Sequence, residues 1–202
     1  MVVKKSVRDA MIDAAATLIG QRGVSASGMQ DIVVEAAAPR GSIYHHFPGG
    51  KDELVIAALT RVGEVVESAI GYAAAKSASA DSFVVAVAAL FRAGAEQNGW
   101  SEGCPVAATA IEGDRQSPAV REAIVAIFRA WQGAIARGLS RHDRADPDFE
   151  ALMLIGAIEG GLLLARGLRS AEPYDAAIAL LRRGLRDTAS AVTGMEAVNA
   201  SQ

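Results

Sequence analysis

The stretch from Ser27 to Leu54 decides the fold, and it reads Ser-Gly-Met-Gln-Asp-Ile-Val-Val-Glu-Ala-Ala-Ala-Pro-Arg-Gly-Ser-Ile-Tyr-His-His-Phe-Pro-Gly-Gly-Lys-Asp-Glu-Leu. Ser27 and Gln30 have the spacing of a helix-capping box, and apolar residues follow at helical intervals, which predicts a short helix over 28–36. Pro39 is tolerated in a first helical turn and the Pro-Gly-Gly at 48–50 ends the segment, so we expect a second helix of barely two turns between them. Two short helices joined by a tight turn are typical of a helix-turn-helix.

Helical signals continue on both sides of this pair. Before it, Ser6 provides a cap and Gly23 a left-handed stop, so the sequence predicts a bracing helix over 7–22. After it, apolar periodicity and the cap-plus-proline pairs at 117–118 and 146–147 predict further helices near 51–75, 81–98, 105–113, 118–140, 147–168 and 174–193. Apolar residues make up 51% of the chain, and strand-favouring residues are sparse. The predicted fold class is all-α, with about nine helices.

The chain of 202 residues is long enough for one domain or for a small domain joined to a larger one. The helix-turn-helix predicts a three-helix N-terminal domain over 1–50, and the remaining helices predict a larger helical domain over 51–193. We expect the tail at 194–202 to be flexible.

Charge, cysteine content and hydropathy exclude several classes of protein. Residues 1–50 carry five Lys or Arg against four Asp or Glu, a net +1, so the rest of the chain carries −4 within the total of −3; this is a weak electrostatic signal for a nucleic-acid binder. The single cysteine, Cys104, rules out an intramolecular disulfide, and no Cys/His spacing suggests a metal or cofactor. The most apolar stretch, 151–165, is shorter than the ~20 residues that span a bilayer and contains Glu159. The N-terminal residues do not have the pattern of a secretory leader, so we expect a cytoplasmic protein with no membrane partner.

Residues 31–54 resemble the DNA-binding signature of the TetR family of repressors. The likeness covers about residues 7–55, and it rests on Gly41-Ser42-Ile43-Tyr44, His46-Phe47 and Lys51-Asp52-Glu53-Leu54 standing in the family's register. The resemblance implies a homodimer that binds a double-stranded DNA operator, with one short helix in each major groove. The residues that it places at the DNA are Ser27, Gly28, Pro39, Arg40, Gly41, Ser42, Tyr44, His45 and Lys51.

The chemistry of these residues agrees with such contacts. The guanidinium of Arg40 can bond guanine O6 and N7 in a bidentate manner, Ser42 and His45 would face the same groove, and Gly41 leaves room for close backbone approach. The residues suited to phosphates are Tyr44, Lys51 and, through the backbone at the start of the first short helix, Ser27 and Gly28. Two alternatives stay open. Tyr44 and Phe47 would merely pack the second short helix onto helix 7–22, and His45 or His46 would be solvated.

One position departs from the family's pattern. Ala37 stands in the turn between the two short helices, where the family usually has glycine. A left-handed backbone there costs a non-glycine residue roughly 1 kcal/mol. We therefore expect a slightly reshaped turn, which the small alanine side chain permits.

Residues 98–112, with their Gly-Cys-Pro step at 103–105, resemble the branch of TetR-type regulators that includes the lincomycin-resistance repressor, and so do residues 158–166. This resemblance implies a chamber for a small apolar or aromatic effector in the larger domain. The candidate pocket residues are Phe91, Trp100, Cys104, Phe128, Trp131 and Glu159. The alternatives are that the aromatic side chains are plain core, that Cys104 is a small buried hydrophobe or a redox trigger, and that Glu159 is structural and pairs with an arginine.

The last two predicted helices carry the argument for a dimer. Glycines remove bulk from helix 147–168, and apolar residues form a seam on helix 174–193, so four such helices can pack across a two-fold axis. The candidate interface residues are Gly156, Gly160, Gly161, Ile178, Leu181 and Leu185, followed by Ala189 and Val192. The alternative is that both helices only close the core of one chain.

The predicted function is a transcriptional regulator, by the family's habit a repressor, that an effector releases from a palindromic operator. The alternatives are a helical enzyme or small-molecule carrier, and an architectural DNA protein without an effector. No nucleophile, base and orienting group stand at useful spacing, and the polar run 142–146 is interpreted as a solvated connection, so we expect no catalytic activity. The Gly-Gly-Lys at 49–51 lacks the first glycine and the Ser/Thr of a phosphate loop.

Overall fold

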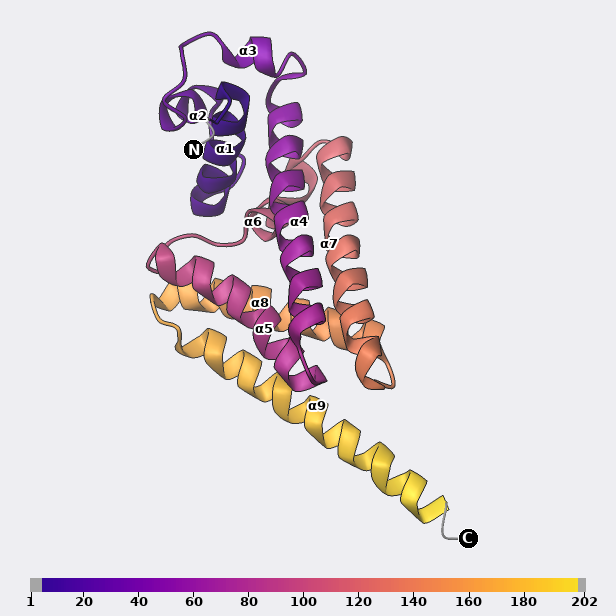
Figure 1. Ribbon diagram of the computed structural model, residues 1–202. Coiled ribbons are helices and arrows are strands. Elements are labelled where there is room, and N and C mark those ends of the chain that lie inside the picture. Colours follow the sequence, from indigo (N-terminus) through magenta and orange to yellow (C-terminus); the bar gives the residue numbers. More distant parts are fainter. Residues whose placement is uncertain (1–4, 200–202) are drawn as a thin grey trace. The chain divides into compact units, whose positions relative to one another are not determined.

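A computed structural model of the chain describes residues 5–199, and the side chains of residues 5–185 (Figure 1). Every regular element in the described part is helical, which confirms the all-α fold class. The α-helices are α1 (Val7–Arg22), α2 (Met29–Glu35), α3 (Ile43–His46), α4 (Gly50–Lys76), α5 (Ala80–Gln97), α6 (Pro105–Ile111), α7 (Pro118–Leu139), α8 (Pro147–Leu168) and α9 (Glu172–Asn199). Two short 3-10 helices, η1 (Gly113–Arg115) and η2 (Ser140–His142), follow α6 and α7. Helix α9 is assigned six residues beyond the predicted helix end at 193, and the expected flexibility of 194–202 stays a prediction.

The predicted helix signals work as capping chemistry requires. The Ser6 hydroxyl accepts a hydrogen bond from the Asp9 N–H at 3.0 Å, and Gly23 ends α1 with φ +81°. The Asp146 carboxylate likewise caps α8 by accepting from the Phe149 N–H at 3.0 Å. Helices α6, α7 and α8 each begin at a proline, whose missing N–H costs nothing in a first turn.

The two short helices differ from their predicted bounds. Helix α2 is capped by Gly28, whose N–H donates to Asp31 at 3.2 Å, so the expected box from Ser27 to Gln30 is wrong. Helix α3 has only four residues, because Pro39 lies in a turn that precedes it. The Ser42 N–H donates to the Pro39 carbonyl at 3.2 Å, and Gly41 has φ +88°, a conformation that interrupts a helix.

The chain forms two compact units. The first comprises residues 1–66 and 101–130, and the second comprises residues 67–100 and 131–202. The first unit therefore holds the three N-terminal helices and also α6, whereas the sequence suggested a division at residue 50. That division by function stays a prediction.

The core of the first unit lies under α1. Helix α1 contacts α2, α3 and α6 (Figure 1). The side chains of Ile43 and Phe47 are completely buried. Helix α6 reaches α1 closely because the Gly103 N–H donates to the Gly20 carbonyl at 3.0 Å, and a Cβ on Gly20 would lie 2.9 Å from the Gly103 oxygen. Glycine at position 20 thus lets these two segments touch.

The core of the second unit is built from α5, α8 and α9, of which α8 and α9 run side by side (Figure 1). The Tyr174 hydroxyl of α9 donates to the Ala88 carbonyl of α5 at 2.7 Å, and the Tyr174 ring is buried. Arg144 forms a bidentate ion pair with Glu150, and the two side chains are only 8% and 10% exposed. The interpretation of 142–146 as a solvated connection holds for the exposed residues 143, 145 and 146 but fails at Arg144, whose nearly buried charge is balanced by Glu150.

Candidate nucleic-acid interface

Helix α3 separates its side chains into a buried and an exposed set. Ile43 and Phe47 point into the core of the first unit, and the Arg8 guanidinium lies 4.9 Å from the centre of the Phe47 ring. Tyr44 is 59% exposed, and His45 is exposed beside it. The alternative that Tyr44 packs onto α1 is therefore wrong, whereas the packing role of Phe47 is confirmed.

The turn between α2 and α3 brings Arg40 to the same exposed surface. Arg40 lies between Pro39 and the left-handed Gly41, and both Arg40 and Pro39 are exposed. Ser42 is half-buried, and its hydroxyl donates to the Pro39 carbonyl at 2.7 Å. The guanidinium of Arg40, with its five N–H donors, is therefore accessible, and the predicted base contact of Arg40 stays a prediction.

The end of α2 has the geometry of a Schellman motif. The Ala38 N–H donates to the Val33 carbonyl and the Ala37 N–H to the Val34 carbonyl, each at 3.0 Å. Ala37 occupies the left-handed position of this motif with φ +49°. The turn is therefore a regular left-handed one with alanine in the place that glycine normally takes, and the slight reshaping expected at Ala37 is not seen.

Ser27 acts inside the chain. It is only 1% exposed, its N–H donates to the Val24 carbonyl at 3.0 Å, and its hydroxyl donates to the Gly23 carbonyl at 2.6 Å. Both of its hydrogen-bond donors are therefore used within the loop. We remove Ser27 from the set of proposed DNA contacts.

Lys51 links the start of α4 to the loop between α1 and α2. Its half-buried ammonium donates to the Val24 carbonyl at 2.7 Å. A lysine ammonium has three donors, so this bond leaves two for a phosphate. The predicted phosphate contact of Lys51 stays a prediction.

An aspartate pair on α1 and a single glutamate after α6, which sequence reasoning missed, hold the helices of this unit in place. On α1, Asp9 and Asp13 both pair with Arg61 of α4, and the hydrogen bonds from Arg61 and Ser6 hold the pKa of Asp9 below its usual value. At the end of α6, the Glu112 carboxylate accepts the Ser25 N–H at 3.1 Å. The i,i+4 spacing of the two aspartates was the only local signal, because the Ser25 and Glu112 positions are 87 residues apart.

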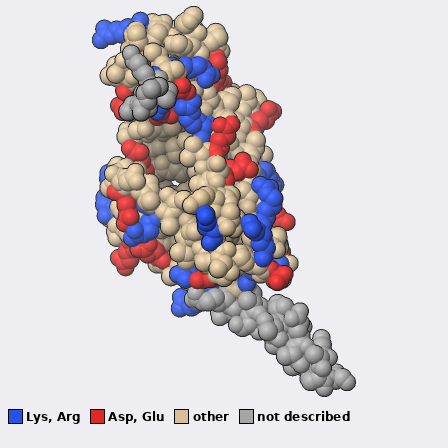
Figure 2. All heavy atoms as spheres, in the orientation of Figure 1, with Lys and Arg blue, Asp and Glu red and all other residues tan. Residues whose placement is uncertain are grey.

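The surface charge of the chain is mixed. On the face shown in Figure 2, basic and acidic side chains are interspersed rather than gathered into one large area of either sign. This agrees with the net charge of −3 and predicts modest non-specific affinity for DNA.

The effector candidates fall in both units. In the second unit, the Phe91 and Trp131 rings meet edge to face with centroids 5.8 Å apart, and the buried Trp100 ring lies 6.1 Å from the ring of Tyr174. Tyr174 is a residue that sequence reasoning missed; burial raises the pKa of its hydroxyl, and the charge of the half-buried Glu159 raises it further. Cys104, the half-buried cap of α6, and the half-buried Phe128 belong to the first unit.

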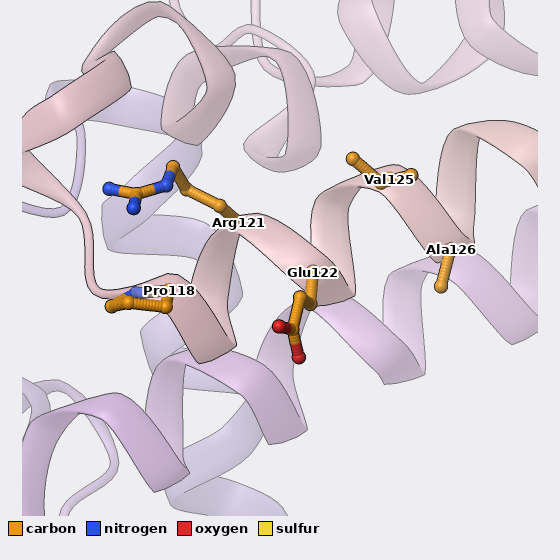
Figure 3. A pocket seen from close by; sticks show the side chains of 5 residues that line it. All are labelled: Pro118, Arg121, Glu122, Val125 and Ala126. Atoms are coloured by element: carbon orange, nitrogen blue, oxygen red, sulfur yellow. The ribbon is translucent and has the colours of Figure 1, made fainter.

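An open hollow of about 400 Å³ lies on the first turns of α7 (Figure 3). The side chains that line it are Pro118, Arg121, Glu122, Val125 and Ala126. None of the predicted effector residues is among them, and all five come from one helix. The hollow therefore lacks the enclosing walls that a small-molecule site needs.

The dimer candidates of α8 divide into two groups. A Cβ on Gly156 or Gly160 would meet nothing within 4 Å, whereas a Cβ on Gly161 would lie 3.1 Å from the Tyr174 Cα. Gly161 therefore serves packing within the chain. The same holds for Ile178, which is buried, while Leu181 and Leu185 are half-buried. The side chains of Ala189 and Val192 lie outside the described residues.

Helix α8 also exposes large apolar side chains that the sequence did not single out. The exposed residues are Phe149, Leu152, Met153, Leu163, Leu164 and Leu168. Together with Gly156 and Gly160 they recur at intervals of three and four, so most of them lie on one face of α8. We call this set the α8 apolar face.

Both parts of the chain match described protein families. Residues 11–58 match the model for bacterial regulatory proteins of the tetR family, and residues 80–179 match the C-terminal domain described as transcriptional regulator LmrA/YxaF-like. An uncharacterised HTH-type transcriptional regulator of Mycobacterium tuberculosis is 32% identical over 189 residues, which is 89% of this chain and 92% of the relative. The HTH-type regulators YxaF and LmrA of Bacillus subtilis are 32% and 29% identical, over 82% of this chain and 87% and 89% of their own lengths.

Solved structures agree with the fold. A TetR regulatory protein from Rhodobacter sphaeroides superposes with a TM-score of 0.80 at 22% identity, covering 88% of this chain and 97% of its own. A TetR transcriptional regulator from Chloroflexus aurantiacus superposes with a TM-score of 0.73 at 29% identity, covering 88% and 92%.

Proposed function

The chain belongs to the TetR family of bacterial transcriptional regulators, with a C-terminal domain of the LmrA/YxaF-like type, and we propose from that premise that it is a dimeric repressor that a small apolar ligand releases from a palindromic operator. It is a DNA-binding regulator of transcription. Regulators of this kind are not enzymes and act in the cytoplasm as a class, and we extend both properties to this chain as part of the proposal.

The exposed set of Arg40, Tyr44 and His45 carries the proposal for operator recognition. These three side chains are exposed on one short segment, over a base formed by the buried Ile43 and Phe47. Rigid packing below and polar groups above are what direct readout of a major groove needs. We assign base reading to Arg40 and phosphate contact to Tyr44.

The α8 apolar face supports the proposed dimer. This face contains exposed leucines, a phenylalanine and two glycines with open space above them. Covering such an apolar surface lowers the free energy of the protein in water. Among the described residues, α8 is the helix long and apolar enough to cross a bilayer by length and composition. We propose that a second copy of the chain, rather than a membrane, covers the apolar face of α8, because a two-fold operator needs two recognition helices.

The effector part of the proposal rests on the aromatic residues of the second unit. Phe91, Trp131 and Trp100 supply flat apolar surfaces, and the half-buried Glu159 supplies a polar group near Tyr174. An apolar or aromatic ligand suits such a set. The ligand would act only through its weaker affinity for the DNA-bound state.

The test is to select genomic fragments with the purified protein and to footprint the enriched site at near-physiological salt. A protected palindrome would support the proposal, and no enrichment over random fragments would overturn it. With the site in hand, Arg40→Ala is expected to weaken binding by about 10- to 100-fold, because a lost bidentate contact costs ~1–3 kcal/mol. Arg115→Ala removes the same charge from the exposed η1 segment and should have little effect.

A further inference from the structure

Helix α6 is part of the matched C-terminal family domain, yet it packs in the same compact unit as the helix-turn-helix. At its start it is tied to α1 by the bond between the Gly103 N–H and the Gly20 carbonyl. A second bond there joins the Gln21 amide to the Glu102 carboxylate at 2.8 Å. At its end it is tied to the loop that joins α1 to α2.

This second attachment is made by Glu112. Both carboxylate oxygens lie 3.1 Å from the Ser25 backbone nitrogen, the Ser25 hydroxyl donates to the same carboxylate, and the Gln116 amide donates to it at 2.7 Å. A Cβ on Gly23 would collide with a Glu112 carboxylate oxygen, so glycine at position 23 lets the carboxylate approach the loop this closely.

The same loop is held from its other side. Lys51 donates to the Val24 carbonyl, and Ser27 closes the loop internally onto Gly23. The carboxylate of Glu112 and the ammonium of Lys51 thus bind the N–H and the C=O of the same peptide group, the one that joins Val24 to Ser25. This loop is the covalent link between the bracing helix α1 and the helix pair α2–α3 that carries Arg40.

We propose that Glu112 is a positioning residue for DNA binding: it fixes the loop at 23–27, and through it the orientation of the α2–α3 pair relative to α1. The inference rests on the proposed function of the helix pair. Recognition groups must be held to a fraction of an ångström by hydrogen bonds behind them, and these bonds are charge-assisted, the strong kind. A displacement of α6 that breaks them would lower operator affinity.

Electrostatics alone predicts the opposite change in DNA affinity when Glu112 is replaced. Removing a negative charge from a protein that binds polyanionic DNA should tighten binding. Asp114, two residues along the chain and exposed on η1, provides the matched control for charge. A loss of affinity in Glu112 variants that Asp114→Asn does not show therefore reports positioning.

The experiment measures binding of the full-length protein to the DNA site that the wild-type chain selects. We expect Glu112→Ala to weaken binding by about tenfold, because the loop at 23–27 loses the charge-assisted hydrogen bonds that hold it. Glu112→Gln, which keeps one acceptor oxygen, should lose less, and Asp114→Asn should bind as well as the wild type or better. Ser25→Ala should weaken binding less in a Glu112→Ala background than in the wild type, because the two residues share one interaction.

Amide hydrogen exchange separates positioning from general destabilisation. Glu112→Gln should speed exchange in the peptide covering 23–28 more than in the peptide covering 11–19 of α1, whereas a purely global destabilisation would speed both equally. If the wild type selects a site and the Glu112 variants bind it like Asp114→Asn, the positioning role alone is overturned. If the wild type selects no site, the proposed function and this inference fall together.

Discussion

At the scale of the residue, Ala37 holds a conformation that costs an L-amino acid free energy. Its φ of +49° places its Cβ close to the following carbonyl, and Ala37→Gly removes that clash. The gain exceeds the added entropy of an unfolded glycine, so we expect the free energy of unfolding to rise by about 0.5–1 kcal/mol. Urea denaturation measures this change.

Ala36 gives the matched control for that substitution. It lies one residue earlier with φ −74°, a conformation that alanine adopts freely. Ala36→Gly should therefore lower the free energy of unfolding by about 0.5–1 kcal/mol. Two losses of equal size would show that the turn at Ala37 is not strained.

Glu112 also makes a prediction about pH. Burial opposes ionisation of its carboxyl, but the hydrogen bonds from Ser25 and the nearby charge of Lys51 outweigh burial and hold the pKa below its usual 4.5. A depressed pKa in the folded state stabilises the fold at pH values above the unfolded-state value, and this stabilisation disappears as the pH falls through the folded-state value. The wild type should thus exceed Glu112→Gln in unfolding free energy at pH 7, and the difference should close as the pH falls below about 4.5. Equal unfolding curves at pH 7 would contradict the stabilising role of the carboxylate.

At the scale of the element, two adjacent glycines of α8 should respond in opposite ways. A Cβ on Gly161 would press on the backbone and ring of Tyr174 at 3.1 Å, so Gly161→Ala should destabilise the chain by about 1–3 kcal/mol. A Cβ on Gly160 meets open space, and alanine is the better helix former there. Thermal unfolding of the two variants measures the contrast, and a similar midpoint for both would contradict the packing of α8 against α9.

The presence of most helices could be predicted because the sequence signals that start and end a helix are local. Ser6, Gly23 and the prolines that open α6, α7 and α8 act on their own helices, so their effect is written within a few residues. The end of α3 was also predictable, but its start was not. The left-handed Gly41 and the bond from Ser42 to Pro39 turn the chain where a proline signal suggested a helix.

The candidate site was predictable only in part. Arg40 and Tyr44 follow from the family's pattern, and their exposure agrees with it. The role of Glu112 could not be predicted, because its partner Ser25 is distant in sequence and no periodic pattern links the two residues. The inward role of Gly161 was equally hidden, since α8 is apolar on both its buried and its exposed sides and the sequence does not say which glycine faces α9.

At the scale of the whole molecule, the two compact units share the matched C-terminal family domain between them. Residues 80–100 and 131–179 of that domain lie in one unit, and residues 101–130 lie in the unit of the helix-turn-helix. The boundary between the two compact units therefore does not coincide with the boundary between the two matched families, which falls between residues 58 and 80. A change in the fold of 101–130 necessarily acts on the unit that carries Arg40.

The α8 apolar face leads to a prediction about assembly. Leu163 is 59% exposed on this face, and a glutamate there would place a charge in the proposed two-fold interface without a partner. Leu163→Glu should therefore sediment as a monomer at micromolar concentration while keeping its helical circular dichroism. Its affinity for the selected operator should fall by about 100-fold or more, because each half-site would then be bound without the effective concentration that a linked second subunit supplies.

Val125 of α7 is also 59% exposed, so Val125→Glu adds the same charge at a site of equal exposure that is not part of the α8 apolar face. This control should remain dimeric and bind the operator with nearly wild-type affinity. Dissociation of both variants would mean that added charge, rather than its position, breaks the dimer. A dimeric Leu163→Glu protein would instead show that the two copies meet through another surface, since burial of an unpaired carboxylate at the two-fold axis costs more than a stable dimer tolerates.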